Sequence, residues 1–147
     1  MELSELYTEV ITEYSRSNKH KHPLKDPTVA MRGVNPSCGD DIKLELKIQD
    51  GIIREAGFSG SGCAISEAST AVMTELIKGK STEAAGNLIK LFIGMIQNTV
   101  TGEEELEELQ EAQAFKDISR MPARVKCAVL SWHTLEEALK IYAVSPA

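Results

Sequence analysis

The sequence has few aromatic residues and no strong basic patch. Seven of its 147 residues are Phe, Trp or Tyr, and its formal net charge at pH 7 is −6. Proteins that bind nucleic acids commonly present clustered lysines and arginines to phosphates, or aromatic rings on which bases stack. Apart from the run Lys19–His22, the basic residues here are dispersed. We therefore expect no nucleic-acid partner.

Long apolar runs are also absent. No stretch approaches the roughly 20 apolar residues of a membrane-spanning helix, so we expect no membrane association. Residues 1–5 are acidic and polar, unlike a secretory signal, and we therefore expect a cytoplasmic protein. The length of 147 residues and the apolar fraction of 42% are typical of one globular domain, predicted over residues 1–147.

Cysteine is scarce, with three residues at positions 38, 63 and 127. An odd number is poorly explained by a disulfide framework, and thiols stay reduced in the cytoplasm. Buried cysteines without chemistry are common, so any one of these taken alone could be a small apolar residue of the core. Cys38 and Cys63, however, lie in stretches rich in Gly, Ser and Pro, which favours a functional interpretation.

The apolar pattern predicts an α+β fold in which a first helix precedes the strands. Apolar and charged residues alternate over residues 42–48, and a turn at 49–51 returns the chain in an antiparallel strand over 52–58. A third, short strand is predicted at 28–33. We expect a small antiparallel three-stranded sheet with helices packed on one face. The helices are predicted at about 3–14, 64–79, 82–100 and 123–142.

Smaller features give further expectations. Thr101 with Glu104, and Thr134 with Glu137, fit the capping box that begins a helix. Six glutamates within residues 103–111 are expected on a solvated helix face, with Leu106 and Leu109 packed inward. His20 and His22 are expected in a solvated loop.

The predicted hairpin brings two cysteines to one edge of the sheet. Cys38 precedes the first of the two paired strands and Cys63 follows the second, and antiparallel pairing places these ends side by side. Three cysteines and an aspartate form a sulfur-rich set suited to zinc or to iron–sulfur chemistry. The spacing matches no zinc-finger pattern. Asp40 and Asp41 are both candidate carboxylates, and strand alternation should point only one of them at a metal.

Three short motifs together resemble the IscU/NifU-N family of iron–sulfur cluster assembly proteins, and within it the SufU branch. The motifs are Asn35–Asp40 (NPSCGD), Gly60–Ser66 (GSGCAIS) and Arg124–Cys127 (RVKC). Cluster scaffolds of this family carry a histidine immediately before the third cysteine, where this chain has Lys126. The acidic segment at about 101–120 is similar to an insertion typical of SufU proteins.

This resemblance implies a zinc site made by Cys38, Asp40, Cys63 and Cys127. It also implies a sulfurtransferase-type relay, in which Cys38 accepts persulfide sulfur from a pyridoxal-phosphate-dependent cysteine desulfurase of the SufS type. The sulfur would then pass to a downstream SUF-type assembly scaffold. Arg124 is a candidate for steering the transferring sulfur.

Two alternatives remain open on the same residues. The first is a scaffold that builds a [2Fe–2S] cluster on Cys38, Cys63 and Cys127, with iron in place of zinc. The second is a zinc-stabilised interaction module without a reactive thiol.

Overall fold

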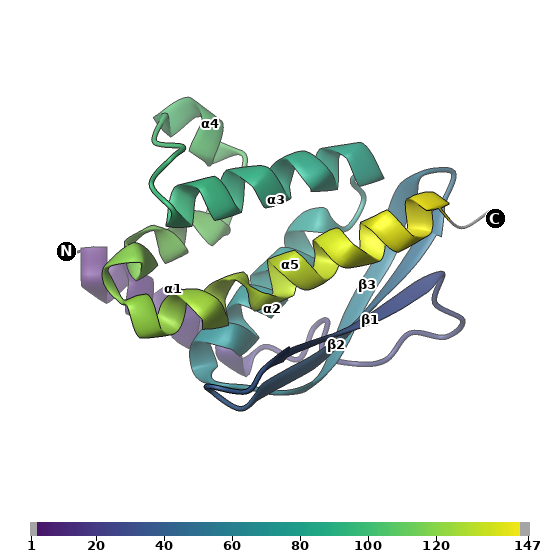
Figure 1. Cartoon of the computed structure of the whole chain (residues 1–147), viewed down its shortest axis with the longest axis horizontal. Helices are drawn as coiled ribbons and strands as arrows, with labels where there is room; N and C mark the ends of the chain where they lie inside the picture. The colour runs from purple at the N-terminus through teal and green to yellow at the C-terminus, as the bar shows by residue number, and fades with distance from the viewer. Residues whose placement is uncertain (1–2, 145–147) are drawn as a thin grey trace.

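A three-stranded antiparallel sheet follows the first helix, and the remaining helices follow the sheet (Figure 1). The structure is a computed structural model that describes residues 3–144, with side chains described from residue 9 onward. The expected α+β class is confirmed. The elements are α1 (Leu3–Arg16), β1 (Val29–Asn35), β2 (Asp40–Gln49), β3 (Ile52–Ser61), α2 (Ala64–Ile77), α3 (Thr82–Ile96), α4 (Glu103–Glu107), the 3-10 helix η1 (Gln110–Arg120) and α5 (Pro122–Val144).

The sheet has the order β1-β2-β3, and its register sets the position of every residue at its open end. Asp50 and Gly51 both have positive φ, as a two-residue hairpin of type I′ requires. The hairpin pairs Asp41 with Ser61, and β1 pairs Asn35 with Asp40. The segments that carry Cys38 and Cys63 therefore leave the sheet at the same end, as predicted.

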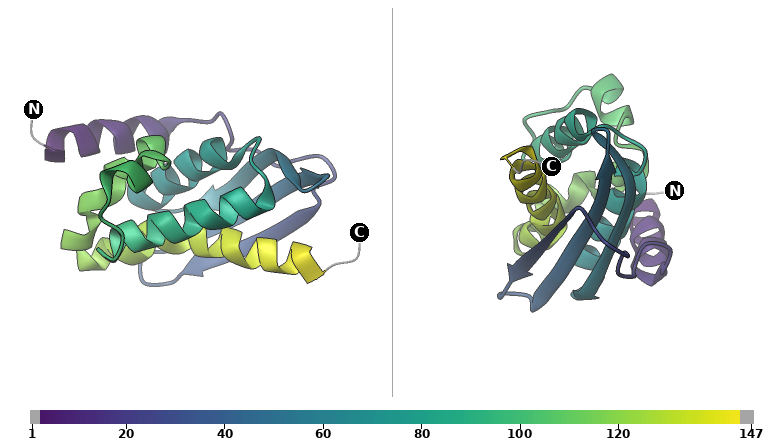
Figure 2. Two further views of the ribbon diagram at one scale, coloured as in Figure 1. Left: turned by 90° about the horizontal axis from the view of Figure 1, so that it is seen from above. Right: turned by 90° about the vertical axis from the view of Figure 1, so that its right-hand side faces the viewer.

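The helices cover the inner face of the sheet. Figure 2 shows α5 beside β1 at one side of the molecule and α1 beyond β3 at the other. In the core between α2, α3 and α5, the Trp132 and Phe92 rings stack with centroids 4.2 Å apart. Trp132 Nε1 donates to Ser69 Oγ, which itself donates to the carbonyl of Ala128. These bonds fix α5 against α2 immediately beyond Cys127.

The outer face of the sheet is only partly open to solvent. The loop that follows α1 reaches β3, where the Phe58 N–H donates to the carbonyl of His20. Glu45 was expected on a wet strand face but is only 4% exposed, and His20, expected in a solvated loop, is 8% exposed. Both expectations are wrong because the loop between α1 and β1 has no apolar periodicity from which its packing could be predicted, and it packs against β3. His22 is exposed as expected.

Two predicted helix starts are also wrong. Gly102, not Thr101, is the N-cap of α4, and no side-chain bond caps this helix. Helix α5 runs through Thr134 without a break, and the Thr134 hydroxyl donates to the carbonyl of Leu130 within the helix. The expectation for the acidic segment is confirmed, since Leu106 and Leu109 are buried and all six glutamates are exposed.

Close packing of β1 on α5 depends on a glycine. A Cβ on Gly33 would overlap the Thr134 hydroxyl. We expect Gly33→Ala to lower the free energy of unfolding by about 1–3 kcal/mol, the range for overpacking a core. Gly86→Ala on α3 is the control, since nothing lies within 4 Å of its added Cβ. It should raise stability by about 0.5–1 kcal/mol. Urea unfolding measures both, and a Gly33→Ala protein as stable as wild type would contradict this packing.

Burial of His20 makes stability depend on pH. Desolvation, followed by the charge of Lys19, lowers the pKa of His20; Lys78 and His22 act in the same direction, and Glu75 opposes them. The unfolded chain therefore binds the proton at a higher pH than the folded chain does. Stability should fall as the pH drops below about 6.5, by at most about 1.4 kcal/mol per pH unit.

Urea unfolding between about pH 7 and pH 5 measures this slope, in a range where the carboxylates remain charged. His20→Gln should flatten the slope, whereas His22→Gln, at an exposed histidine two residues away, should keep it. Equal slopes in wild type and His20→Gln would rule out His20 as the cause.

Candidate metal centre

The candidate site lies at the open end of the sheet, where four segments meet. Cys38 lies in the turn between β1 and β2, Asp40 begins β2, and Cys63 is the N-cap of α2. Cys127 comes from the second turn of α5. The turn that holds Cys38 is tight: its N–H donates to the carbonyl of Asn35, and Gly39 adopts a φ of 72°.

The structure brings together Cys38, Asp40 and Cys127. Their candidate ligand atoms all lie within 4.8 Å of one another. The Cys127 thiol donates to Cys38 Sγ over 3.1 Å. Asp40 is fully buried and Cys127 is 1% exposed, whereas Cys38 is partly exposed. The cluster therefore has a closed floor and opens to solvent on the side of Cys38.

Cys63 borders this cluster without joining the 4.8 Å group. Its backbone N–H donates to Asp40 Oδ1 over 2.9 Å, and its Sγ accepts the N–H of Ser66. Burial, followed by hydrogen bonding with Cys38, Cys63 and Asp40, raises the pKa of the Cys127 thiol. The thiol of Cys63 is thus one of the groups that raise the pKa of Cys127. Its place among the ligands stays a prediction.

Asn35 is a site residue that the sequence reasoning missed. Its Nδ2 donates to Asp40 Oδ2 over 3.3 Å and lies 3.8 Å from Cys127 Sγ. Asn35 has the same strand parity as the buried Val29 and Gly33, so its side chain points inward. A polar residue at an inward strand position, three residues before the candidate ligand Cys38, is the signal that could have identified it.

The donor set fits a divalent cation. Asp40 is a buried carboxylate, and no ion pair joins it to a lysine or arginine in the described part of the chain. A buried charge without a partner is costly, and coordination of a cation removes that cost. Two or three thiols with one carboxylate suit zinc or iron better than magnesium or calcium, which prefer all-oxygen sites.

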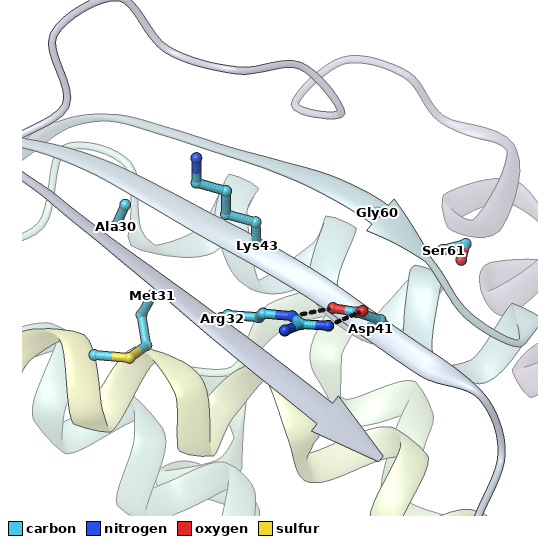
Figure 3. Close-up of a pocket in the computed structure, with 7 residues that line it drawn as sticks. All are labelled: Ala30, Met31, Arg32, Asp41, Lys43, Gly60 and Ser61. Atoms are coloured by element: carbon cyan, nitrogen blue, oxygen red, sulfur yellow. Dashed lines mark hydrogen bonds and ion pairs between the residues drawn. The ribbon is translucent and has the colours of Figure 1, made fainter. Parts of the chain in front are cut away.

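Asp41 faces away from this cluster. Its carboxylate forms a two-pronged ion pair with Arg32, at 2.9 Å from Nε and 2.6 Å from Nη2. Figure 3 shows this pair on the outer face of the sheet, while Met31 points to the opposite side, toward α5. The pair lines a hollow of about 500 Å³ together with Lys43 and Ser61. Strand alternation therefore separates the two aspartates, as predicted.

The remaining candidates lie on the exposed surface of α5. Arg124 is exposed, one helical turn before Cys127. Lys126 is also exposed, whereas Cys127 beside it is buried. His133 pairs with Glu136 over 3.9 Å and lies away from the cluster on the exposed side of α5. Arg124 is therefore accessible to a partner, and its role stays a prediction.

Comparison with known proteins identifies the family. The model of the NifU-like N-terminal domain matches residues 6–147. The chain belongs to this family. The iron–sulfur cluster assembly scaffold protein IscU of Thermotoga maritima is 42% identical over 135 residues, which cover 92% of this chain and 93% of that protein. The resemblance seen in the three motifs is thus confirmed.

A second relative has a more specific name. The zinc-dependent sulfurtransferase SufU of Bacillus subtilis is 40% identical over 137 residues, covering 93% of this chain and 91% of that protein.

Solved structures share this fold. The SufU crystal structure from Fervidobacterium islandicum AW-1 superposes with a TM-score of 0.85 at 36% identity, covering 92% of this chain and 97% of that one. The N-terminal NifU-like protein of Brucella abortus, at 17% identity and a TM-score of 0.86, shares the fold. Within residues 3–144, no helix combines the length and apolar character that crossing a membrane requires.

Substitution tests which of the two aspartates contributes to metal binding. Asp40→Asn keeps the shape of the side chain but removes the charge of a candidate ligand. We expect it to lower zinc affinity by at least about tenfold, since even changes around metal ligands have effects of that size. Asp41→Asn is the matched control and should leave the affinity within about twofold of wild type, because its carboxylate faces Arg32. Competition with a chromogenic chelator measures both, and the opposite ranking would assign the carboxylate to Asp41.

Proposed function

We propose that this protein is a zinc-binding sulfur carrier of iron–sulfur cluster assembly. It accepts persulfide sulfur from a pyridoxal-phosphate-dependent cysteine desulfurase on Cys38 and passes it to an assembly scaffold. The observation that carries the proposal is the position of Cys38: it is partly exposed in a turn, whereas Asp40 and Cys127 are buried and Cys63, also partly exposed, is the N-cap of a helix. The relative from B. subtilis, named a zinc-dependent sulfurtransferase, supports the same activity.

The proposed zinc ligands are Cys38, Asp40, Cys63 and Cys127. The mutual proximity of three of them, and the contacts of Cys63 with both Asp40 and Cys127, support this set. Bound zinc would hold the thiols as thiolates at neutral pH, because the metal competes with the proton. Asp40 is the hard ligand in a soft set and is therefore the weaker one for this type of metal.

Cys38 is the acceptor in this proposal because of its position. Cys127 is buried within a helix, and Cys63 Sγ accepts a backbone N–H at the start of α2. Cys38 instead lies between Pro36 and Gly39, on a turn that belongs to no helix. A thiolate there can meet a sulfur donor that approaches from solvent.

The transfer step balances without an external oxidant. The Cys38 thiolate attacks the outer sulfur of the desulfurase persulfide, a new S–S bond forms, and the S–S bond of the donor breaks. The electron pair of the broken bond stays on the desulfurase cysteine, which leaves as a thiolate. Cys38 then carries the persulfide with its proton. Arg124, exposed one turn before Cys127, would attract the anionic groups of this exchange.

A scaffold function on the same cysteines is the second candidate. The relative from T. maritima, named a cluster assembly scaffold, favours it. The exposed Lys126 beside Cys127 weighs against it, because the family resemblance implies a histidine at that position in cluster scaffolds. A coloured protein containing iron and sulfide as isolated would favour the scaffold. A zinc module that leaves desulfurase turnover unchanged is the third candidate.

The acceptor assignment is tested with Cys38→Ala. We expect this variant to accept no labelled persulfide sulfur from the desulfurase and to lose its stimulation of desulfurase turnover. Radiolabelled or mass-tagged cysteine as substrate measures the transfer. Arg124→Ala should reduce the transfer rate while the bound zinc stays at the wild-type amount. Labelling of Cys38→Ala at the wild-type rate would overturn the acceptor role.

A further inference from the structure

Ser66 carries a buried hydroxyl that has no hydrogen-bond partner within the described residues. The side chain is 1% exposed, and its Oγ is one of three fully buried side-chain oxygen or nitrogen atoms without a partner there. Most buried polar groups in folded proteins are hydrogen-bonded. The backbone of Ser66 already contacts the site, because its N–H donates to Cys63 Sγ. The hydroxyl therefore lies beside the metal centre and is not accounted for by the fold.

A glycine shows where this hydroxyl lies relative to the carboxylate. A Cβ on Gly62 would lie 2.8 Å from Asp40 Oδ1 and 3.1 Å from Ser66 Oγ. The two oxygens thus border the same small space, which Gly62 leaves free by having no side chain. A serine hydroxyl is a donor and a carboxylate is an acceptor, so the two groups are chemically matched.

We propose that Ser66 is a positioning residue for Asp40, and that its hydroxyl donates to the Asp40 carboxylate when that carboxylate binds metal. The proposal rests on the metal centre described above and not on sulfur transfer. It requires a rotation of the Ser66 side chain or a small shift of Asp40 across the space at Gly62.

The acceptor capacity of the carboxylate supports this assignment. A carboxylate offers about four acceptor positions. Cys63 N–H and Asn35 Nδ2 occupy two of them, one on each oxygen. The Ser66 hydroxyl would occupy a third and leave one position for the cation. Asp40 would then bind through a single oxygen, with its orientation fixed by three donors from two segments of the chain, the end of β1 and the start of α2.

Hydroxyl removal separates this role from general stability. Ser66→Ala deletes the donor. Thr70→Val on the same helix is the matched control, because it removes a fully buried hydroxyl that donates to the carbonyl of Ser66, one turn farther from Asp40. Zinc affinity is measured by chelator competition, and thermal unfolding is followed in parallel for each variant. The absorption spectrum of the cobalt(II)-loaded protein reports directly on the ligand geometry.

We expect Ser66→Ala to lower zinc affinity by about tenfold, as for other groups that orient metal ligands. The cobalt(II) bands should shift in this variant. Thr70→Val should unfold at a lower temperature but keep the wild-type affinity and spectrum. Ser66→Thr, which retains a hydroxyl, should restore most of the affinity. Gly62→Ala should behave as Ser66→Ala does, because its methyl group fills the space between the two oxygens.

Wild-type affinity and an unchanged cobalt(II) spectrum in Ser66→Ala would overturn the proposal. An equal loss in Ser66→Ala and Thr70→Val would also overturn it, since it would show a general effect of removing hydroxyls from α2. If the methyl group of Ser66→Thr prevents folding, the cobalt(II) spectrum of Ser66→Ala still decides whether Ser66 positions Asp40. Desulfurase stimulation is a separate measurement, so a protein that binds zinc through Ser66-oriented Asp40 but gives no stimulation would refute the sulfur-carrier function alone.

Discussion

The fully buried carboxylate of Asp40 is the constraint on which the arrangement of the site depends. It accepts the N–H of Cys63 at the start of α2 and the side-chain amide of Asn35 at the end of β1. One charged group thereby links two strands and a helix that are not continuous in the chain. Because a buried charge without compensation is costly, these donors stabilise the same geometry that a bound cation would stabilise. The hydrogen bond from its N–H to Asp40 thus fixes the position of Cys63.

The register of the sheet decides which of two adjacent aspartates has its carboxylate buried. Strand β2 turns Asp40 inward and Asp41 outward, where Arg32 binds Asp41 across the strands. A slip of one residue would exchange the two carboxylates and place the whole inner row of apolar side chains in solvent. Burial of Leu44 and Leu46 therefore helps to keep Asp40 turned inward, together with its own hydrogen bonds.

Features with a local cause could be predicted from the sequence. Asp50 and Gly51 are residue types that adopt the positive φ of this turn, and Ser81 caps α3 through its own side chain. The placement of Cys38 and Cys63 at the same end of the sheet followed from hairpin geometry. Features with a tertiary cause could not be predicted in this way. Thr134 fits a capping box but lies against Gly33 inside a continuous helix, and the burial of His20 depends on where a loop crosses β3. Strand alternation could have placed Asn35 inward, but the proposed role of Ser66 depends on which atoms face Asp40, which no spacing reveals.

The cluster combines rigid and adjustable parts, and this division bears on how a thiol could both bind metal and react. Cys127 is fixed by α5, whose contact with α2 is secured by Ser69. Cys63 is fixed as the cap of α2. Cys38 alone belongs to a turn, which begins at Pro36 and ends at a glycine with positive φ. If the cluster binds metal as proposed, Cys38 is the candidate ligand whose release would disturb no helix, whereas Cys63 and Cys127 belong to α2 and α5.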